Sequence, residues 1–300
     1  MSWFYLALLA PLLYAIVNLI DDNLLNFVYK SPYLATVSAG FYGALPLLSR
    51  FFLPSHKLPT NLAFLAVFGG VLTLTYIFFY FKSLQVETPS VVVALFGLAP
   101  ATIPILAHFF VHEHLTALEI LGFLIVLSAS LGLAVDNIHE FKFSKALWPM
   151  IIAVIFMDAA TLMTKYDYQR ADFYSVYLYF SAGMAIGGIF FWLIKMKENK
   201  RGLISILPKI KKLLPILIAA EIIAVTAELT LNLAISRGPV SLVKVIEGIQ
   251  PMYVLLIALI LYPFRPKFFR EAESGHIIRK FILMAIIIAG LTIIGLASQA

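Results

Sequence analysis

Long apolar runs recur along the whole chain, and short polar segments separate them. A helix needs roughly 20 mostly apolar residues to cross the hydrocarbon core of a bilayer. Ten predicted spans meet this need: 2–20, 33–53, 62–81, 89–111, 117–135, 147–164, 173–194, 214–236, 239–262 and 280–298. The runs are continuous, whereas barrel strands alternate over about ten residues. The pattern therefore predicts an all-α polytopic membrane protein with ten transmembrane helices.

The composition agrees with this prediction. Hydrophobic residues make up 62% of the chain and charged residues 13%, whereas a soluble domain has roughly 45–50% and about 25%. A soluble enzyme and a disordered chain are therefore excluded. The chain has no cysteine, which excludes disulfides and thiolate metal sites. The formal charge is +6, but the basic residues lie between the apolar runs, so we expect no nucleic-acid partner.

The basic residues also bear on orientation, because cytoplasmic loops of membrane proteins carry an excess of Lys and Arg. If both termini face outward, most of the basic residues fall in inner loops. The outer loops then hold only Arg50, Lys57, Lys165, Arg170 and Arg237. The charge distribution therefore favours termini on the outside.

A motif of Ser-x6-Gly-x2-Pro occurs twice, in the fourth and ninth predicted spans. Ser90, Gly97 and Pro100 recur 151 positions later as Ser241, Gly248 and Pro251. We therefore expect two five-helix repeats, 1–140 and 141–300. Because five is odd, the second repeat enters the membrane from the opposite side, as in many secondary transporters with a site near the midplane. The Gly and Pro residues of the motif are expected helix breaks or pivots.

The segment from Ser90 through Glu113-His114-Leu115 and Gly122 to Leu133 resembles the EamA-type signature of the drug/metabolite transporter superfamily. In that signature a small-residue helix with a mid-span proline leads into a short Glu-containing loop and then a Gly-bearing helix. One departure is that the usual Gly-Glu of the loop is His112-Glu113 here. The resemblance implies a five-plus-five helix repeat, transport of a metabolite, and termini on the inside, opposite to the charge distribution.

The eighth predicted span carries a polar stripe of Glu221, Glu228 and Asn232 on one helix face. An ionisable residue inside a span costs about 2.5–3.5 kcal/mol and usually faces the protein interior or a water-filled cavity. Glu228 is the strongest candidate, because about a dozen residues separate it from the start of its span. It can carry a proton or be the counter-ion of a cationic cargo. Glu221 is close enough to the span end for headgroup contact as the alternative.

Further polar residues are expected along the substrate or proton pathway, which we place along the third, fourth, eighth and ninth spans. Lys244 and Glu247 can pair at i,i+3, and a purely structural ion pair is the alternative. The remaining candidates lie in four spans: Gln250, Tyr76, Tyr80, Asn18, Asp158 and Thr161. Asp21 and Asp22 are expected at the membrane interface.

Absent motifs narrow the function. The chain has no Gly-x4-Gly-Lys-[Ser/Thr], His-Glu-x2-His or Gly-x-Ser-x-Gly sequence, which excludes an ATP-driven pump and argues against hydrolase chemistry. We therefore expect not an enzyme but a secondary active transporter, an exporter or exchanger of small polar or amphipathic metabolites such as amino acids. A lipid-modifying enzyme and a lipid-flipping accessory subunit stay open as alternatives.

We expect no cofactor and no metal. The partners are small-molecule cargo, membrane lipids and possible coupling protons, with the chain as a monomer or homodimer in a bacterial or archaeal inner membrane.

Overall fold

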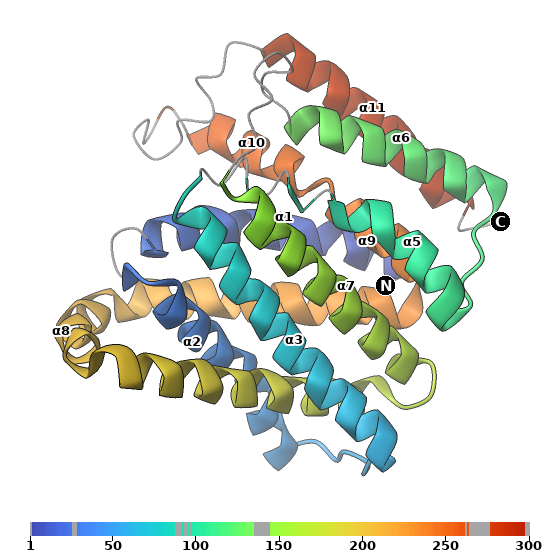
Figure 1. Cartoon of the computed structure of the whole chain (residues 1–300). Helices are drawn as coiled ribbons and strands as arrows, with labels where there is room; N and C mark the ends of the chain where they lie inside the picture. Colours follow the sequence, from blue (N-terminus) through green and yellow to red (C-terminus); the bar gives the residue numbers. More distant parts are fainter. Residues whose placement is uncertain are drawn as a thin grey trace.

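The computed structural model describes residues 2–25, 29–87, 98–134, 145–261 and 277–297, together with residues 92, 95, 96 and 263. Every regular element in these ranges is helical (Figure 1). The elements are α1 (Trp3–Leu24), α2 (Pro32–Gly43), the 3-10 helix η2 (Leu45–Phe51), α3 (Thr60–Leu84), α5 (Leu98–Val111), α6 (Ala117–Ala134), α7 (Leu147–Tyr168), α8 (Phe173–Arg237), α9 (Val240–Glu247), α10 (Gln250–Leu261) and α11 (Ile277–Ala297).

Six helical segments of the described chain are long and apolar enough to cross a membrane. They are Trp3–Asp21, Thr60–Leu84, Leu147–Tyr168, Phe173–Met196, Leu217–Arg237 and Val240–Leu261. Shorter apolar helices cover Thr102–Val111, Ala117–Ala129 and Ala285–Ala297. Each of the ten predicted spans overlaps a helix, so the helical character is confirmed for the described chain. The count of ten spans stays a prediction.

The second predicted span is two elements rather than one. Its first part is α2, which ends at Gly43, and its second part is η2, with Pro46 in the first turn. A proline has no backbone N–H to donate to the preceding turn, and it disfavours α-helical geometry in the residue before it. The α-helix therefore ends before Pro46, and the chain continues as a 3-10 helix.

The ninth predicted span is also interrupted. α9 ends at Glu247 with Gly248 as its C-cap, and α10 begins at Gln250. Pro251 is the second residue of α10, where the first backbone N–H groups have no intrahelical acceptor in any case. In the first half, α5 begins at Leu98 with Pro100 in its first turn, whereas Gly97 lies outside the described residues.

α8 covers two predicted spans. Figure 1 shows it as two arms that run back along each other; we call residues 173–196 the first arm and residues 217–237 the second arm. The helix begins with Asp172 as N-cap, whose side chain accepts a hydrogen bond of 2.8 Å from the backbone N–H of Ser175. A capping oxygen satisfies one of the four donors that a helix start leaves free.

The helices pack closely where small residues meet. α3 packs against α7 and the first arm of α8. Where α3 meets α8, a Cβ atom on Gly183 would overlap the backbone carbonyl oxygen of Val67. A Cβ atom on Gly70 would likewise overlap the backbone carbonyl oxygen of Phe180. Only glycine permits this approach of two backbones.

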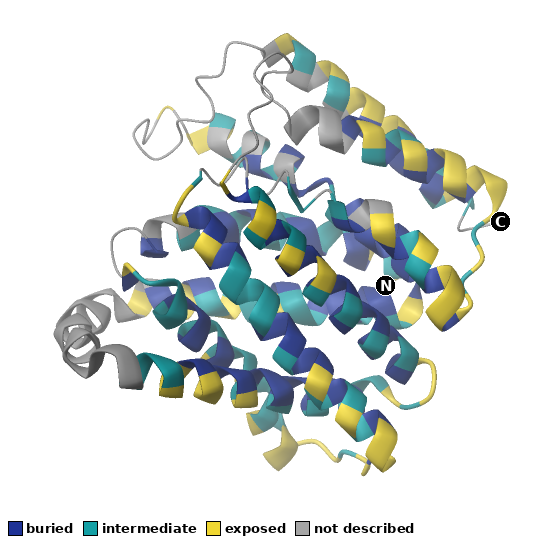
Figure 2. Ribbon diagram, viewed as in Figure 1, coloured by how far each residue is buried: buried dark blue, intermediate teal, exposed yellow. Residues whose placement is uncertain are grey.

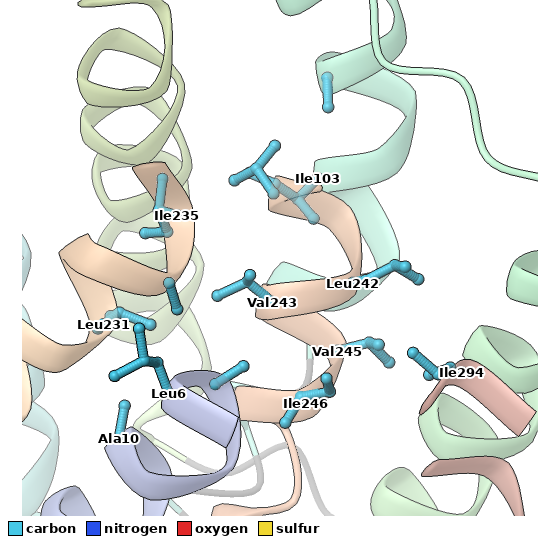
Figure 3. Packing of buried hydrophobic residues seen from close by; sticks show 14 of the residues in the cluster. Leu6, Ala10, Ile103, Leu231, Ile235, Leu242, Val243, Val245, Ile246 and Ile294 are labelled. Atoms are coloured by element: carbon cyan, nitrogen blue, oxygen red, sulfur yellow. The ribbon is translucent and has the colours of Figure 1, made fainter. Parts of the chain in front are cut away.

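The apolar core includes a large cluster to which helices from both halves of the chain contribute. Figure 3 shows Leu6 of α1, Ile103 of α5, Leu231 of α8, Val243 of α9 and Ile294 of α11 within one cluster. α6 and α11 pack against each other beside this core (Figure 1). Their outward faces are exposed (Figure 2), as expected of helices that contact lipid.

Candidate functional site

A cavity of ≈ 150 Å³ lies between helices from both halves of the chain. Its walls come from α1, α2, α3, α5, α7, both arms of α8, and the α9–α10 break. Nine of the sequence-predicted residues line it: Asn18, Tyr76, Tyr80, Glu221, Glu228, Lys244, Glu247, Gly248 and Gln250. The structure therefore brings together side chains from four predicted spans.

Glu228 lies in this wall and is held by two neutral donors. The Tyr14 hydroxyl donates to its Oε2 at 2.5 Å, and the Asn232 amide donates to its Oε1 at 2.8 Å. The Asn232 carbonyl oxygen in turn accepts from the Tyr168 hydroxyl at 2.9 Å. Asn232 does not line the cavity and contacts it only through its hydrogen bond to Glu228. Neutral donors fix the carboxyl group without cancelling its charge.

Glu221 lies two helical turns earlier on the same arm, at the end of a hydrogen-bond chain. Its Oε1 accepts from the Ser38 hydroxyl at 3.2 Å, and Ser38 is 2.8 Å from the Tyr29 hydroxyl. Because the Ser38 proton is directed at Glu221, Tyr29 donates to Ser38. Burial raises the pKa of the Tyr29 phenol above its usual value, which keeps it a neutral donor.

Lys244 and Glu247 form the ion pair that their spacing allows. Lys244 Nζ is 2.6 Å from Glu247 Oε2, with the two side chains 3% and 18% exposed. Glu247 is the last residue of α9, beside the Gly248 break. The one lysine of the cavity wall is therefore already neutralised by a carboxylate on its own helix.

Asn18 and two aromatic residues of α3 form another part of the wall. The Tyr80 hydroxyl donates to Asn18 Oδ1 at 3.0 Å, and Tyr76 packs edge-to-face on Phe96. The Asn18 side chain is only 6% exposed, yet its Nδ2 has no acceptor among the described residues. Buried polar groups are normally paired, so this amide suits a polar ligand or a water molecule in the cavity.

Three sequence-predicted residues lie outside the cavity wall: Asn232, Asp158 and Thr161. Asp158 accepts a short hydrogen bond from Thr102 of α5, while its other carboxyl oxygen has no partner in the described structure. Thr161 donates to the Met157 carbonyl oxygen at 2.8 Å. Asp158 thus links α7 to α5. The side chains of Pro100 and Pro251 are not described, and Gly97 lies outside the described residues.

Sequence reasoning missed the contribution of α2 and, apart from Asn18, that of α1. Tyr14, Ser38, Tyr29 and Tyr42 contact or approach the two glutamates, and Asp21, which was expected at the membrane interface, lines the cavity. A signal for Tyr14 existed, because it precedes Asn18 by four residues and so shares its helix face. No comparable feature of the local sequence indicated Ser38.

Two charged residues outside the cavity hold the corner between α8 and α9. The Glu113 carboxylate accepts from the backbone N–H groups of Val240 at 2.6 Å and Ser241 at 2.9 Å. Lys165 Nζ donates to the carbonyl oxygens of Ile235 at 2.8 Å and Gly238 at 2.6 Å. An anion at a helix start and a cation at a helix end complement the unpaired backbone groups there.

The neighbouring His112 has a φ of 53°. This left-handed conformation favours glycine, the residue that the resembled signature carries before its glutamate. His112 therefore adopts a conformation that glycine adopts more readily.

Comparison with known proteins supports the sequence resemblance. Residues 1–135 match the model of the EamA-like transporter family. No curated protein gives a significant match. Twenty-eight chains of known structure are similar. The alignment with one crystal structure covers 97% of this chain and 94% of the other chain, with a TM-score of 0.67 and 18% sequence identity. At that identity the likeness shows a shared fold alone.

The apolar helices indicate an integral membrane protein, and the family match covers the first of the two predicted repeats. The resemblance to the drug/metabolite transporter superfamily is thereby confirmed, because residues 1–135 match the EamA-like transporter family.

Proposed function

We propose that the chain is a secondary active transporter, an exporter or exchanger, that moves small polar or amphipathic metabolites through the central cavity. The observation that carries this proposal is the position of Glu228, a carboxyl group in the cavity wall held only by neutral donors. Ionisable residues inside spans are expensive and mark substrate or proton pathways. The match to a transporter family supports the same reading.

The helix contacts support an inverted repeat of residues 1–140 and 141–300. If a two-fold rotation exchanges the two halves, the contact between α3 and α7 corresponds to the contact between the second arm of α8 and α1. The contacts of α2 with the first arm of α8, α5 with α9, and α6 with α11 each join one predicted span to its own counterpart. A two-fold relation between the halves requires both kinds of contact.

The break between α9 and α10 supports the proposed transport site, because it lies in the cavity wall. Gly248 lines the cavity, directly after the Lys244–Glu247 pair. Discontinuous helices near the midplane are a common feature of transporter binding sites, because unwound backbone offers free polar groups. We propose that Gly248 and Pro251, with Gly97 and Pro100 in the first half, are the pivots of alternating access.

Proton coupling at Glu228 is part of the proposal. A carrier that uses a proton gradient needs a group that loads and releases protons on opposite sides, and Glu228 is the carboxyl group placed for this task. The membrane proposed is a bacterial or archaeal inner membrane, with the chain as a monomer or homodimer.

Vesicle transport tests the proposal directly. The full chain is reconstituted into sealed proteoliposomes, and accumulation of radiolabelled amino acids and amines is measured with and without a pH gradient. We expect accumulation that needs a gradient or internal cargo, with the cargo recovered unchanged. Covalent conversion of the cargo would favour an enzyme, and absence of flux by folded protein would contradict a transporter that acts alone.

Cysteine labelling tests the pathway separately, because the chain has no native cysteine. Ala224 lines the cavity, whereas Ile222 on the same arm is 57% exposed on the outer surface. We expect Ala224→Cys to react with a membrane-impermeant thiol reagent at a rate that cargo changes. Ile222→Cys is the matched control and should stay unreactive in the bilayer.

A further inference from the structure

Two carboxyl groups of the cavity have no ion-pair partner in the described chain, and both lie on the second arm of α8. These are Glu221 and Glu228. We propose that the cargo is a linear aliphatic diamine, bound with one ammonium group at each of these carboxylates. This inference rests on the proposed transport function and specifies the cargo of the same cavity.

The spacing of the two glutamates suits such a molecule. The seven residues from Glu221 to Glu228 correspond to a rise of about 10.5 Å along the helix axis. The two side chains differ in direction around that axis by only about 20°. Charge-assisted contacts take about 2.8 Å at each end, which leaves roughly 5 Å along the axis when all atoms are collinear. A chain of four or five methylene groups spans roughly 6–7.5 Å between its nitrogens when fully extended, and bent contacts or a gauche turn in the chain accommodate that length.

The wall between the glutamates is apolar. Ala224 and Val225 lie between them on the same arm, and Ala39, Ile77 and Met184 line the cavity from other helices. Small and aliphatic side chains leave room for methylene groups and give them an apolar environment. On this arm, small and aliphatic side chains therefore separate the two carboxylates, as methylene groups separate the two ammonium groups of the proposed cargo.

Tyrosines surround both carboxylates. Tyr29 and Tyr42 are close enough to Glu221 to interact with its charge, and Tyr76 and Tyr177 interact in the same way with the charge of Glu228. All four line the cavity. An ammonium group is attracted to the face of an aromatic ring as well as to a carboxylate, so each end of the cavity offers two kinds of cation contact.

The charge balance argues against an amino acid of the same length. An α-carboxylate would need a cation, and the lysine of the cavity wall is only 3% exposed and already paired with Glu247 at 2.6 Å. Asn18 offers a free amide donor, but this donor is neutral. A cargo carboxylate would therefore lie near Glu228 without a positive partner, which a site of low polarity penalises.

Three probes with the same five-carbon chain test the proposal. They are 1,5-diaminopentane, lysine, which adds one carboxylate, and 1-aminopentane, which lacks one ammonium group. Binding to the full purified chain in detergent is measured by calorimetry at constant ionic strength. We expect 1,5-diaminopentane to bind at least tenfold more tightly than either of the others.

Glutamine variants then locate the two ammonium groups. Glu221→Gln and Glu228→Gln should each weaken 1,5-diaminopentane binding at least tenfold, to about the affinity of 1-aminopentane. 1-Aminopentane itself should lose affinity in only one variant, because it has one ammonium group. Glu119→Gln is the control, since Glu119 lies outside the cavity at the start of α6 and glutamine keeps its hydrogen bonds to Thr116.

The outcomes separate cargo from function. Equal or tighter binding of lysine, or no binding of 1,5-diaminopentane by folded protein, would overturn the diamine proposal. Vesicle flux of a neutral amino acid without diamine binding would overturn it too, while leaving the transport function intact. Diamine binding that depends on both glutamates, but without flux in vesicles, would support the site and contradict the transport function.

Discussion

The Tyr14 hydroxyl of α1 donates a hydrogen bond of 2.5 Å to the Glu228 carboxylate of α8, across 214 positions of the sequence. It joins the first helix of one predicted half to the central carboxyl group of the other. Because no cation in the described chain pairs with Glu228, this contact and that of Asn232 set the direction in which the carboxyl group faces the cavity.

The first prediction concerns this contact. Tyr14→Phe removes a donor to a buried carboxyl group, and we expect it to lower the free energy of unfolding by about 1.5–3 kcal/mol. In Glu228→Gln protein the same change should cost at least 1 kcal/mol less, because interacting residues are not additive. Denaturant titration in mixed micelles measures both values. Tyr5→Phe, at a position 57% exposed on the same helix, is the control, and strict additivity would show that the contact contributes nothing.

A second prediction tests the ion pair in the cavity wall. Lys244→Ala leaves the Glu247 carboxylate without its partner, and breaking a buried pair costs about 3–5 kcal/mol. Adding Glu247→Gln removes the uncompensated charge and should restore part of the stability and the yield of folded protein. If both single variants unfold like the wild type and the double variant shows no coupling, the pair does not stabilise the fold.

The third prediction concerns the corner between α8 and α9. Glu113→Ala removes the acceptor of two backbone N–H groups at the start of α9, and loss of a helix cap costs about 0.5–2 kcal/mol. Glu113→Gln keeps one acceptor oxygen and should lose less. Hydrogen exchange should accelerate at Val240 and Ser241, and unchanged exchange in Glu113→Ala would mean that another group caps this helix.

The fourth prediction follows from the φ of 53° at His112. A non-glycine residue in this conformation carries strain of order 1–3 kcal/mol, whereas glycine adopts it freely but loses more entropy on folding. We expect His112→Gly to raise the free energy of unfolding by about 1 kcal/mol. His114→Gly in the same loop should lower it, because no positive φ is relieved there. A loss of stability in both variants would contradict the argument.

Much of the helical structure could be predicted from the sequence, because apolar continuity depends on local composition. The break after Glu247 could also be anticipated, since Gly248 and Pro251 disfavour an unbroken helix regardless of their neighbours. The polar stripe of Glu221 and Glu228 was visible for the same reason. Each of these features is a property of one segment.

The partners of those side chains could not be predicted. Ser38 and Tyr14 contact the glutamates only because α1 and α2 pack against α8, and nothing in the local sequence specifies that contact. Asp158 shows the same limit: its depth in a span is visible in the sequence, but its hydrogen bond to Thr102 of α5 is not. A single sequence gives the depth of a polar residue within its span, whereas the direction in which its side chain points depends on long-range packing.

The most direct test of the account is uphill transport by Glu228→Gln protein in sealed proteoliposomes, beside the wild type and the Glu119→Gln control. We predict that Glu228→Gln folds normally but accumulates no cargo against a gradient. Cargo-for-cargo exchange then shows the role: exchange that survives without dependence on the pH gradient identifies a proton carrier, and exchange that fails as well identifies a cargo ligand. Wild-type accumulation with wild-type pH dependence in the folded variant would contradict the account.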